Sequence, residues 1–193
     1  MKKKALLLVL AAVVLVIGSV AGTLAYLTAT SGTVTNTFTV GAVGLDLWEH
    51  QLNSDGALGT NKVTKNTYHL VPGGTYLKDP TVVVKGKSEP CVVFVRVENG
   101  LSAILDGFTL NNGWVQPDAA HSDLYKYSTV VQKADTDQEL VVFGNFKVLK
   151  NVTDLSNYSS AEIKVTAFAI QSQNVDDATA LSEAIAKLYP SGT

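Results

Sequence analysis

The sequence predicts an all-β fold, an antiparallel two-sheet sandwich of the jelly-roll kind, with a short C-terminal helix and an N-terminal signal helix in front of it. Three observations support this prediction. Most of the 193 residues fall in segments where apolar and polar residues alternate, and these segments are rich in Val, Thr, Tyr and Phe. Turn residues separate about eight such segments. Only the two ends of the chain follow another pattern.

Residues 1–25 have the pattern of an export signal. Lysines at the start are followed by an unbroken apolar run over residues 5–17 and then by small residues up to Ala25. This order is typical of a cleaved leader, so we expect cleavage between Ala25 and Tyr26. An uncleaved membrane anchor is the alternative, because residues 5–27 carry no charge and roughly 20 apolar residues can span a bilayer. Only such an uncleaved leader would hold the protein in a membrane.

The charge balance favours an extracellular protein that does not bind nucleic acid. The leader contains three of the 15 lysine and arginine residues and none of the 17 acidic residues, so the rest of the chain is acidic. Binding to a phosphate backbone requires a basic surface, which excludes nucleic acid as a partner. We expect the exported part to be secreted and to remain outside the cell or at its surface.

The main part of the chain is predicted to be one β-domain over residues 37–193. The alternation over residues 33–49 is interrupted by Gly41 and Gly44, which favours a bulge or a bend. Residues 53–61 are rich in Asn, Asp and Gly and indicate a turn. Further strands are expected over residues 62–71, 76–85, 91–98, 124–132, 139–149 and 163–170.

Two of these strands carry further information about their place in the sheets. Pro80 has no backbone N–H, so the strand over residues 76–85 begins after it or runs along a sheet edge. In residues 91–98, Cys91 is in phase with valines such as Val93 and therefore faces a core. We expect this only cysteine to be buried and inert, rather than a reactive thiol or an intermolecular bridge.

The C-terminal segment changes to a helical period. Leu181, Ile185 and Leu188 form an apolar stripe after a pair of aspartates, which favour a helix start, and Pro190 ends the helix. The polar face is acidic and mixed rather than rich in lysine. We therefore expect a cap packed on the β-domain and not a membrane-binding helix.

No arrangement of side chains points to an enzyme. His50, His69 and His121 form no HExxH, HxH or HxxxH pair, and no nucleotide-binding or Gly-x-Ser-x-Gly motif is present. Asp135 and Asp137 lie in a segment that lacks the Gly and the distal Glu of a calcium loop. We predict no catalytic residue, no metal site and no cofactor. Two scattered carboxylates that face each other, as in a glycosidase, remain an open alternative.

Aromatic residues leave a carbohydrate-binding module as another alternative. Stacking on sugar rings requires aromatic side chains on one accessible face, whereas aromatic residues in strands usually pack in the core or across strands. The residues that such a platform would use are Trp48, Tyr68, Tyr76, Trp114, Tyr125 and Tyr127.

Residues 26–36 (YLTATSGTVTN) directly follow the expected cleavage site. They contain no charged residue and are rich in threonine, which favours a strand. Exposed strand edges are normally protected by charge or proline, and this segment has neither. We predict that it adds to a sheet edge, of its own domain or of a neighbour, through Tyr26, Leu27 and Val34, together with Phe38, which follows the segment. Addition to a neighbour joins unlike surfaces, so the contact does not close on itself.

Segments spread over most of the chain resemble one known family. They are AGTLAYLT at 21–28, NTFTVG at 36–41, LVPG at 70–73, CVVFVRVE at 91–98 and VTAFAIQ at 165–171. Together these segments resemble the TasA/camelysin (CalY) family of exported proteins from Gram-positive bacteria. The leader and residues 38–41 carry the most specific part of the resemblance.

The resemblance implies an export route, a fold and a function. A SipW-type signal peptidase would cut the bond between Ala25 and Tyr26. The product would be a jelly-roll subunit of biofilm-matrix fibres that donates residues 26–36 to another copy or to a related subunit. Camelysin-like members also carry a metallopeptidase label. This sequence offers no zinc motif to match it, so a secreted metalloprotease stays an alternative.

Overall fold

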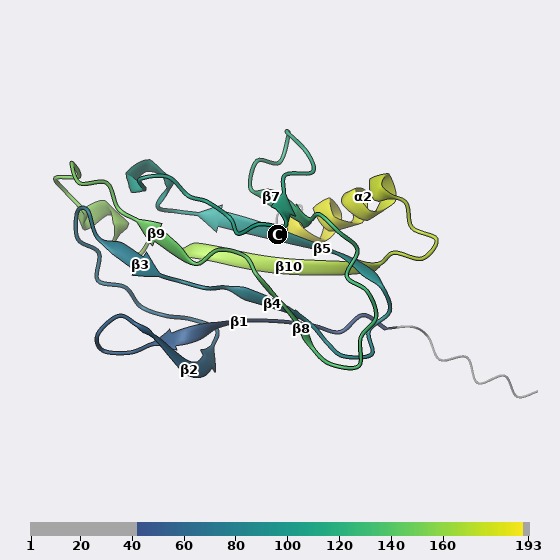
Figure 1. Ribbon diagram of the computed structural model, residues 1–193. Helices are drawn as coiled ribbons and strands as arrows, with labels where there is room; N and C mark the ends of the chain where they lie inside the picture. The colour runs from purple at the N-terminus through teal and green to yellow at the C-terminus, as the bar shows by residue number, and fades with distance from the viewer. Residues whose placement is uncertain (1–41, 191–193) are drawn as a thin grey trace, which may run out of the picture. The chain divides into compact units, whose positions relative to one another are not determined.

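The computed structural model describes residues 42–190, which belong to one compact unit. The leader and residues 26–36 lie outside this range. Within the range, no helix is both long and apolar enough to cross a membrane. The protein is mostly β-structure, with three antiparallel sheets and one short α-helix near the C-terminus (Figure 1). At this level, the predicted all-β fold with a C-terminal helix is confirmed.

Ten strands and the helix α2 follow one another in the described part of the chain. The first five strands are β1 (Leu45–Leu52), β2 (Leu58–Val63), β3 (Thr75–Leu77), β4 (Thr81–Val84) and β5 (Cys91–Asn99). The remaining elements are β6 (Trp114–Val115), β7 (Leu124–Tyr127), β8 (Gln138–Val141), β9 (Asn145–Lys147), β10 (Ile163–Gln171) and α2 (Asp177–Leu188).

The strands form two four-stranded sheets and one two-stranded sheet. The first sheet has the order β2-β1-β4-β8, the second has the order β10-β5-β7-β6, and β3 pairs with β9. The longest ladder joins β5 to β10 over nine residue pairs, from Ile163 opposite Asn99 to Gln171 opposite Cys91. β10 is therefore a long strand that lies at the edge of its sheet.

β1 and β10 run in opposite directions because of the way the two larger sheets are joined. A short loop connects Val84 at the end of β4 to Cys91 at the start of β5, so these two strands meet at one end of the sheets. Leu45, at the start of β1, pairs with Val84, and Gln171, at the end of β10, pairs with Cys91. We call the end of the sheets where β4 ends and β5 begins the near end. The opposite end, where β10 begins, is the far end.

The two larger sheets share one hydrophobic core. Val84 of β4 and Val93 and Val95 of β5 belong to it, and none of them is more than 1% exposed. Alternate residues of a strand point to opposite faces, so Val92 and Phe94 point away from this core and pack against α2 instead. Each such burial contributes about 1.5–3 kcal/mol. β5 is thus buried on both faces.

Cys91 lies in the same core. Its side chain is fully buried, and burial raises the pKa of the thiol to about 11. A buried thiol that stays protonated is a poor nucleophile. The expectation of a buried cysteine on the core face is confirmed.

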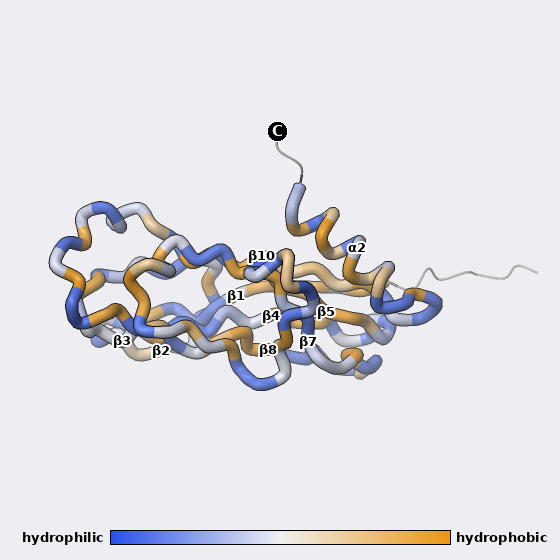
Figure 2. Tube along the Cα trace, turned by 90° about the horizontal axis from the view of Figure 1, so that it is seen from above, coloured by the Kyte–Doolittle hydropathy of each residue, from blue (hydrophilic) through white to orange (hydrophobic). Residues whose placement is uncertain are grey.

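The helix α2 lies against the second sheet, on the side of β10 and β5 (Figures 1 and 2). Asp176 caps its start, because its carboxylate accepts a hydrogen bond from the Thr179 N–H at 2.7 Å. The buried residues Ala180, Ala184 and Leu188 pack against the outward row of β5. The predicted packed cap is therefore confirmed.

Some predicted strands have different bounds in the structure. β2 begins at Leu58, inside the segment expected to be a turn, because it pairs with β1 as a hairpin. The stretch 76–85 is divided at Pro80 into β3 and β4, and the stretch 139–149 is divided into β8 and β9. The divisions agree with the pairing, since β3 bonds to β9 while β4 bonds to β8.

Candidate functional site

β1 and β10 each have one free edge. β10 pairs with β5 along its whole length and with no described strand on its other side. β1 pairs with β4 over Leu45 to Trp48, and its pairing with β2 begins only at Glu49. The first half of β1 therefore also has a side without a described strand. β1 and β10 contact each other, so these two edges lie side by side, and we call the space between them the gap.

The register of β10 shows which of its backbone groups point into this gap. In an antiparallel ladder, alternate residues direct both their N–H and their C=O to the same side. The Ser172 N–H donates to the Pro90 C=O at 2.8 Å, so the even-numbered residues of β10 face β5. Val165, Ala167 and Ala169 consequently direct their N–H and C=O groups into the gap.

The same reasoning applies to β1. The Gly44 N–H donates to Ser88 Oγ at 3.1 Å, and the Gly44 C=O accepts from the Lys85 N–H at 3.0 Å. Both bonds lie on the β4 side of the strand. Leu45 and Leu47 therefore direct their N–H and C=O groups to the other side, into the gap.

At the far end, the gap widens into a groove of about 960 Å³, which we call the β1–β10 groove. Leu47 and Glu49 of β1 line one side, and Ile163 and Val165 of β10 line the other. The segments before β3 and before β10 complete the walls. A groove bordered by two strand edges has the shape and the backbone groups to receive an extended chain.

The walls of the gap are apolar and incompletely covered. Val165, Ala167 and Ala169 pack against the shared core but are only partly buried. Val93 and Val95, which lie opposite on β5, are fully buried. The leucines of β1 that border the gap are partly buried in the same way. An apolar side chain placed in the gap would therefore cover surface that now contacts water.

The floor of the groove is polar and carries a buried ion pair. Glu49 Oε2 and Lys78 Nζ lie 2.6 Å apart, and their side chains are only 5% and 12% exposed. Tyr68 lies close to them, and its hydroxyl donates to the Leu77 C=O at 3.1 Å. Burial raises the pKa of Tyr68 well above its ordinary value, and the negative charges of Glu49 and Asp79 add to this.

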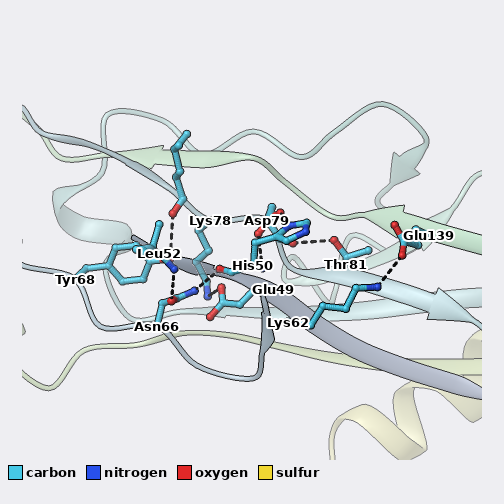
Figure 3. A network of polar contacts seen from close by, with 11 residues as sticks. Glu49, His50, Leu52, Lys62, Asn66, Tyr68, Lys78, Asp79, Thr81 and Glu139 are labelled. Carbon is cyan, nitrogen blue, oxygen red and sulfur yellow. Dashed lines mark hydrogen bonds and ion pairs between the residues drawn. The ribbon is translucent and has the colours of Figure 1, made fainter. Parts of the chain in front are cut away.

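A second set of polar contacts fixes β1 where β4 no longer pairs with it (Figure 3). The His50 N–H donates to Asp79 Oδ1 at 3.0 Å, and the Asn66 amide bonds to the His50 C=O and the Leu52 N–H. The Asp79 carboxylate also lies 2.5 Å from His50 Nδ1. These side chains take the place of a neighbouring strand, so the network holds one wall of the groove in position.

The opposite flank of the two sheets is closed. Trp114 Nε1 of β6 donates to the Val141 C=O of β8 at 3.0 Å, and the Asn111 N–H donates to the Val142 C=O at 2.8 Å. The Trp114 ring is buried in the shared core. These bonds tie the edges of the two sheets together on this side, in contrast to the gap between β1 and β10.

The residues predicted to form the cleavage site and the assembly strand lie outside the described residues. They are Ala25, Tyr26, Leu27, Val34 and Phe38. The structure begins with Ala42, whose C=O accepts from the Glu89 N–H at 3.3 Å at the near end. Ala42, the first described residue, therefore lies at the end opposite the groove.

The histidines have separate partners. His50 bonds to Asp79, and His121 bonds to Asp118. His69 is exposed. Over residues 42–190, no group of three or more His, Cys, Asp or Glu side chains is placed to hold a metal ion.

The aromatic side chains considered for a carbohydrate platform are packed against other groups. A lysine ammonium lies 3.9 Å from the centroid of the Trp48 ring. Trp114 is buried and packs edge-on against Tyr127. Tyr68 packs edge-on against Tyr76. Trp48 and Tyr68 line the β1–β10 groove, whereas Trp114, Tyr125 and Tyr127 pack in or against the shared core.

Comparison with protein families, curated proteins and solved structures found no match for this chain. The resemblance to the TasA/camelysin family therefore stays a prediction from the segments quoted above.

Sequence reasoning did not identify the groove or its ion pair. Glu49 and Lys78 are 29 positions apart and belong to no motif. One signal was present, because Glu49 continues the inward row of Leu45 and Leu47 with a charged residue. A charge in an apolar row of a strand indicates a buried partner.

Proposed function

We propose that the protein is an exported structural subunit, not an enzyme, and that copies join when the N-terminal segment of one enters the β1–β10 groove of another. The open gap between two strand edges carries this proposal. We further infer that the two larger sheets face each other as the halves of a jelly-roll-like sandwich, since both contribute to one core. The inserted strand would close the open flank of that sandwich.

The bonds at the start of β1 favour insertion into a second copy. The C=O of Ala42 and both backbone groups of Gly44 bond to the loop after β4, so these residues are held beside that loop at the near end. A turn within residues 42–44 would break these bonds. The groove of a neighbouring copy can be reached without breaking them.

The N-terminal segment is long enough to extend along the whole of β10 in a neighbouring copy. Residues 26–41 can extend over roughly 50 Å, whereas the nine residues of β10 cover roughly 30 Å. The segment has no charged side chain, so its side chains can enter the apolar gap without desolvation of an ion. Its backbone N–H and C=O groups would find partners on β10 and β1.

The positions of donor and acceptor favour an open chain of copies. Ala42, to which the segment is joined through residues 37–41, lies at the near end, while the groove lies at the far end. Such a contact is head-to-tail and joins unlike surfaces, so each added copy offers a new groove. The partners are other copies or related subunits, and a SipW-type signal peptidase would free the segment during export. The expected location is outside the cell, at its surface or in a biofilm matrix.

Electron microscopy and sedimentation of purified protein test this proposal. The form that begins at Tyr26 is expected to assemble into fibres or large complexes, whereas a form that lacks residues 26–36 is expected to stay monomeric. A form in which the same residues are replaced by Gly and Ser of equal length serves as the matched control and is also expected to stay monomeric. Assembly of the truncated form would contradict the proposal.

A further inference from the structure

The turn that leads into β6 lies beside the closed flank and contains an asparagine followed by a glycine. The Trp114 N–H donates to the Asn111 C=O at 3.4 Å, so the two central residues of this turn are Asn112 and Gly113. We infer that Asn112 is a site of spontaneous deamidation, and that the isoaspartate form of this residue loosens the closed flank. The inference goes beyond the proposed function and does not depend on it.

Deamidation at this position needs only the backbone, hydroxide and water. The Gly113 nitrogen loses its proton to hydroxide and forms a bond to Cγ of Asn112, and the side-chain nitrogen takes up a proton from water and leaves as ammonia. Water then opens the resulting cyclic imide at one of its two carbonyl groups. Opening at Cγ gives aspartate. Opening at the backbone carbonyl gives isoaspartate, in which the main chain runs through the former side chain and contains an extra CH₂ group.

The reacting groups of Asn112 and Gly113 are accessible and not held by other groups. The Asn112 side chain is exposed, and within residues 42–190 its amide has no hydrogen-bond partner. No described group accepts a hydrogen bond from the Gly113 N–H. Glycine also has no side chain that would shield its nitrogen. Attack on Cγ of Asn112 therefore requires no hydrogen bond of these two groups to break first.

The fold requires glycine at position 113. Gly113 has a φ of 101°, a conformation that residues with a side chain rarely adopt. A Cβ atom at this position would lie 2.7 Å from the Tyr127 ring. That ring packs edge-on against Trp114, so moving it would disturb the closed flank. The glycine that makes Asn112 reactive is thus needed for the packing of the flank.

The pair Asn99 and Gly100 at the end of β5 provides an internal comparison. The Gly100 N–H donates to the Glu162 C=O at 2.9 Å, and Asn99 Oδ1 accepts from the Leu101 N–H at 3.0 Å. Both bonds hold the reacting groups in other positions and must break before an imide forms. We therefore expect Asn99 to react at least about tenfold more slowly than Asn112.

Isoaspartate at position 112 would lengthen the main chain between two of the bonds that close the flank. The Asn111 N–H donates to the Val142 C=O at 2.8 Å, and Trp114 Nε1 donates to the Val141 C=O at 3.0 Å. Both bonds depend on the distance between their donors, and an extra CH₂ group in the turn changes that distance. Aspartate at the same position adds a charge but leaves the main chain unaltered. We therefore expect only the isoaspartate form to loosen the flank.

Peptide mapping by mass spectrometry tests the reaction. The form that begins at Tyr26 is kept at mildly alkaline pH for several days, and the gain of about 1 Da per converted asparagine is followed at Asn112 and Asn99. Conversion at Asn112 is expected to be at least about tenfold faster. Asn112→Gln is the matched control and is expected to react far more slowly, because its longer side chain must close a larger ring. An unmodified Asn112, or equal conversion at both asparagines, would overturn the inference.

Hydrogen exchange tests the effect on the flank. The isoaspartate form is isolated by chromatography and compared with a freshly prepared Asn112→Asp protein, which carries the same charge on an unaltered main chain. The Trp114 indole N–H is expected to exchange at least about tenfold faster in the isoaspartate form. The Thr166 N–H, in the β5–β10 ladder, is expected to exchange equally in both. Equal exchange at Trp114 would overturn the loosening of the flank, and so would an equal acceleration at Thr166, because the effect would then not be local.

Discussion

Glu49 and Lys78 hold opposite charges away from water at the floor of the groove. Breaking such a pair leaves one charge buried without compensation. We predict that Lys78→Met lowers the free energy of unfolding by about 3–5 kcal/mol. Replacing both residues, as Glu49→Leu with Lys78→Met, is expected to restore most of this loss. Urea denaturation of the form that begins at Tyr26 measures both effects, and equal stability of wild type and Lys78→Met would contradict the role given to the pair.

The buried phenol of Tyr68, in the groove, makes the stability of the folded protein depend on pH above pH 10. Its pKa is raised in the folded protein above its ordinary value of 10.0, so the folded state favours the neutral phenol. The stability that this contributes is complete below pH 10, and it is lost as the pH rises because the unfolded chain ionises first. We predict that Tyr68→Phe loses less stability than wild type between pH 8 and pH 11. Denaturation midpoints at the two pH values measure this, and an equal loss in both proteins would contradict it.

At the scale of elements, the closed flank depends on Trp114. Its ring fills the core between β6 and β8, and its indole N–H bonds to the Val141 C=O. We predict that Trp114→Ala lowers the free energy of unfolding by about 3–5 kcal/mol, with a smaller loss for Trp114→Phe, which keeps a ring. Thermal or urea denaturation measures the difference. A Trp114→Ala protein as stable as wild type would show that this flank is held in another way.

The elements that the sequence predicts best are those whose own residues carry a hydrophobic period and recognisable ends. β5 and β10 combine an unbroken run of strand-forming apolar residues with a stretch that alternates, and α2 has an apolar stripe, a capping aspartate and a terminating proline. β2 has no clear alternation, and it exists because β1 pairs with it. The polar floor of the groove joins residues from separate segments. No local sequence pattern predicts contacts between such distant residues, because only the folded structure brings the residues together.

For the whole molecule, the two flanks of the larger sheets differ. One is closed by Trp114 and by backbone bonds, and the other leaves two strand edges facing a gap. The first described residue, Ala42, lies at the end opposite the β1–β10 groove. These two asymmetries, taken with an uncharged leading segment, are what a subunit of a head-to-tail assembly requires.

Binding of a synthetic peptide of residues 26–41 to the protein that lacks residues 1–41 tests the central claim most directly. Ligands that bind only the folded state raise its stability, and a peptide at about 100 times its dissociation constant would raise Tm by roughly 5–10 °C. A peptide with Val34→Asp and Phe38→Asp is the matched control and is expected to cause no shift. No shift with the natural peptide, or equal shifts with both peptides, would show that the groove does not receive this segment.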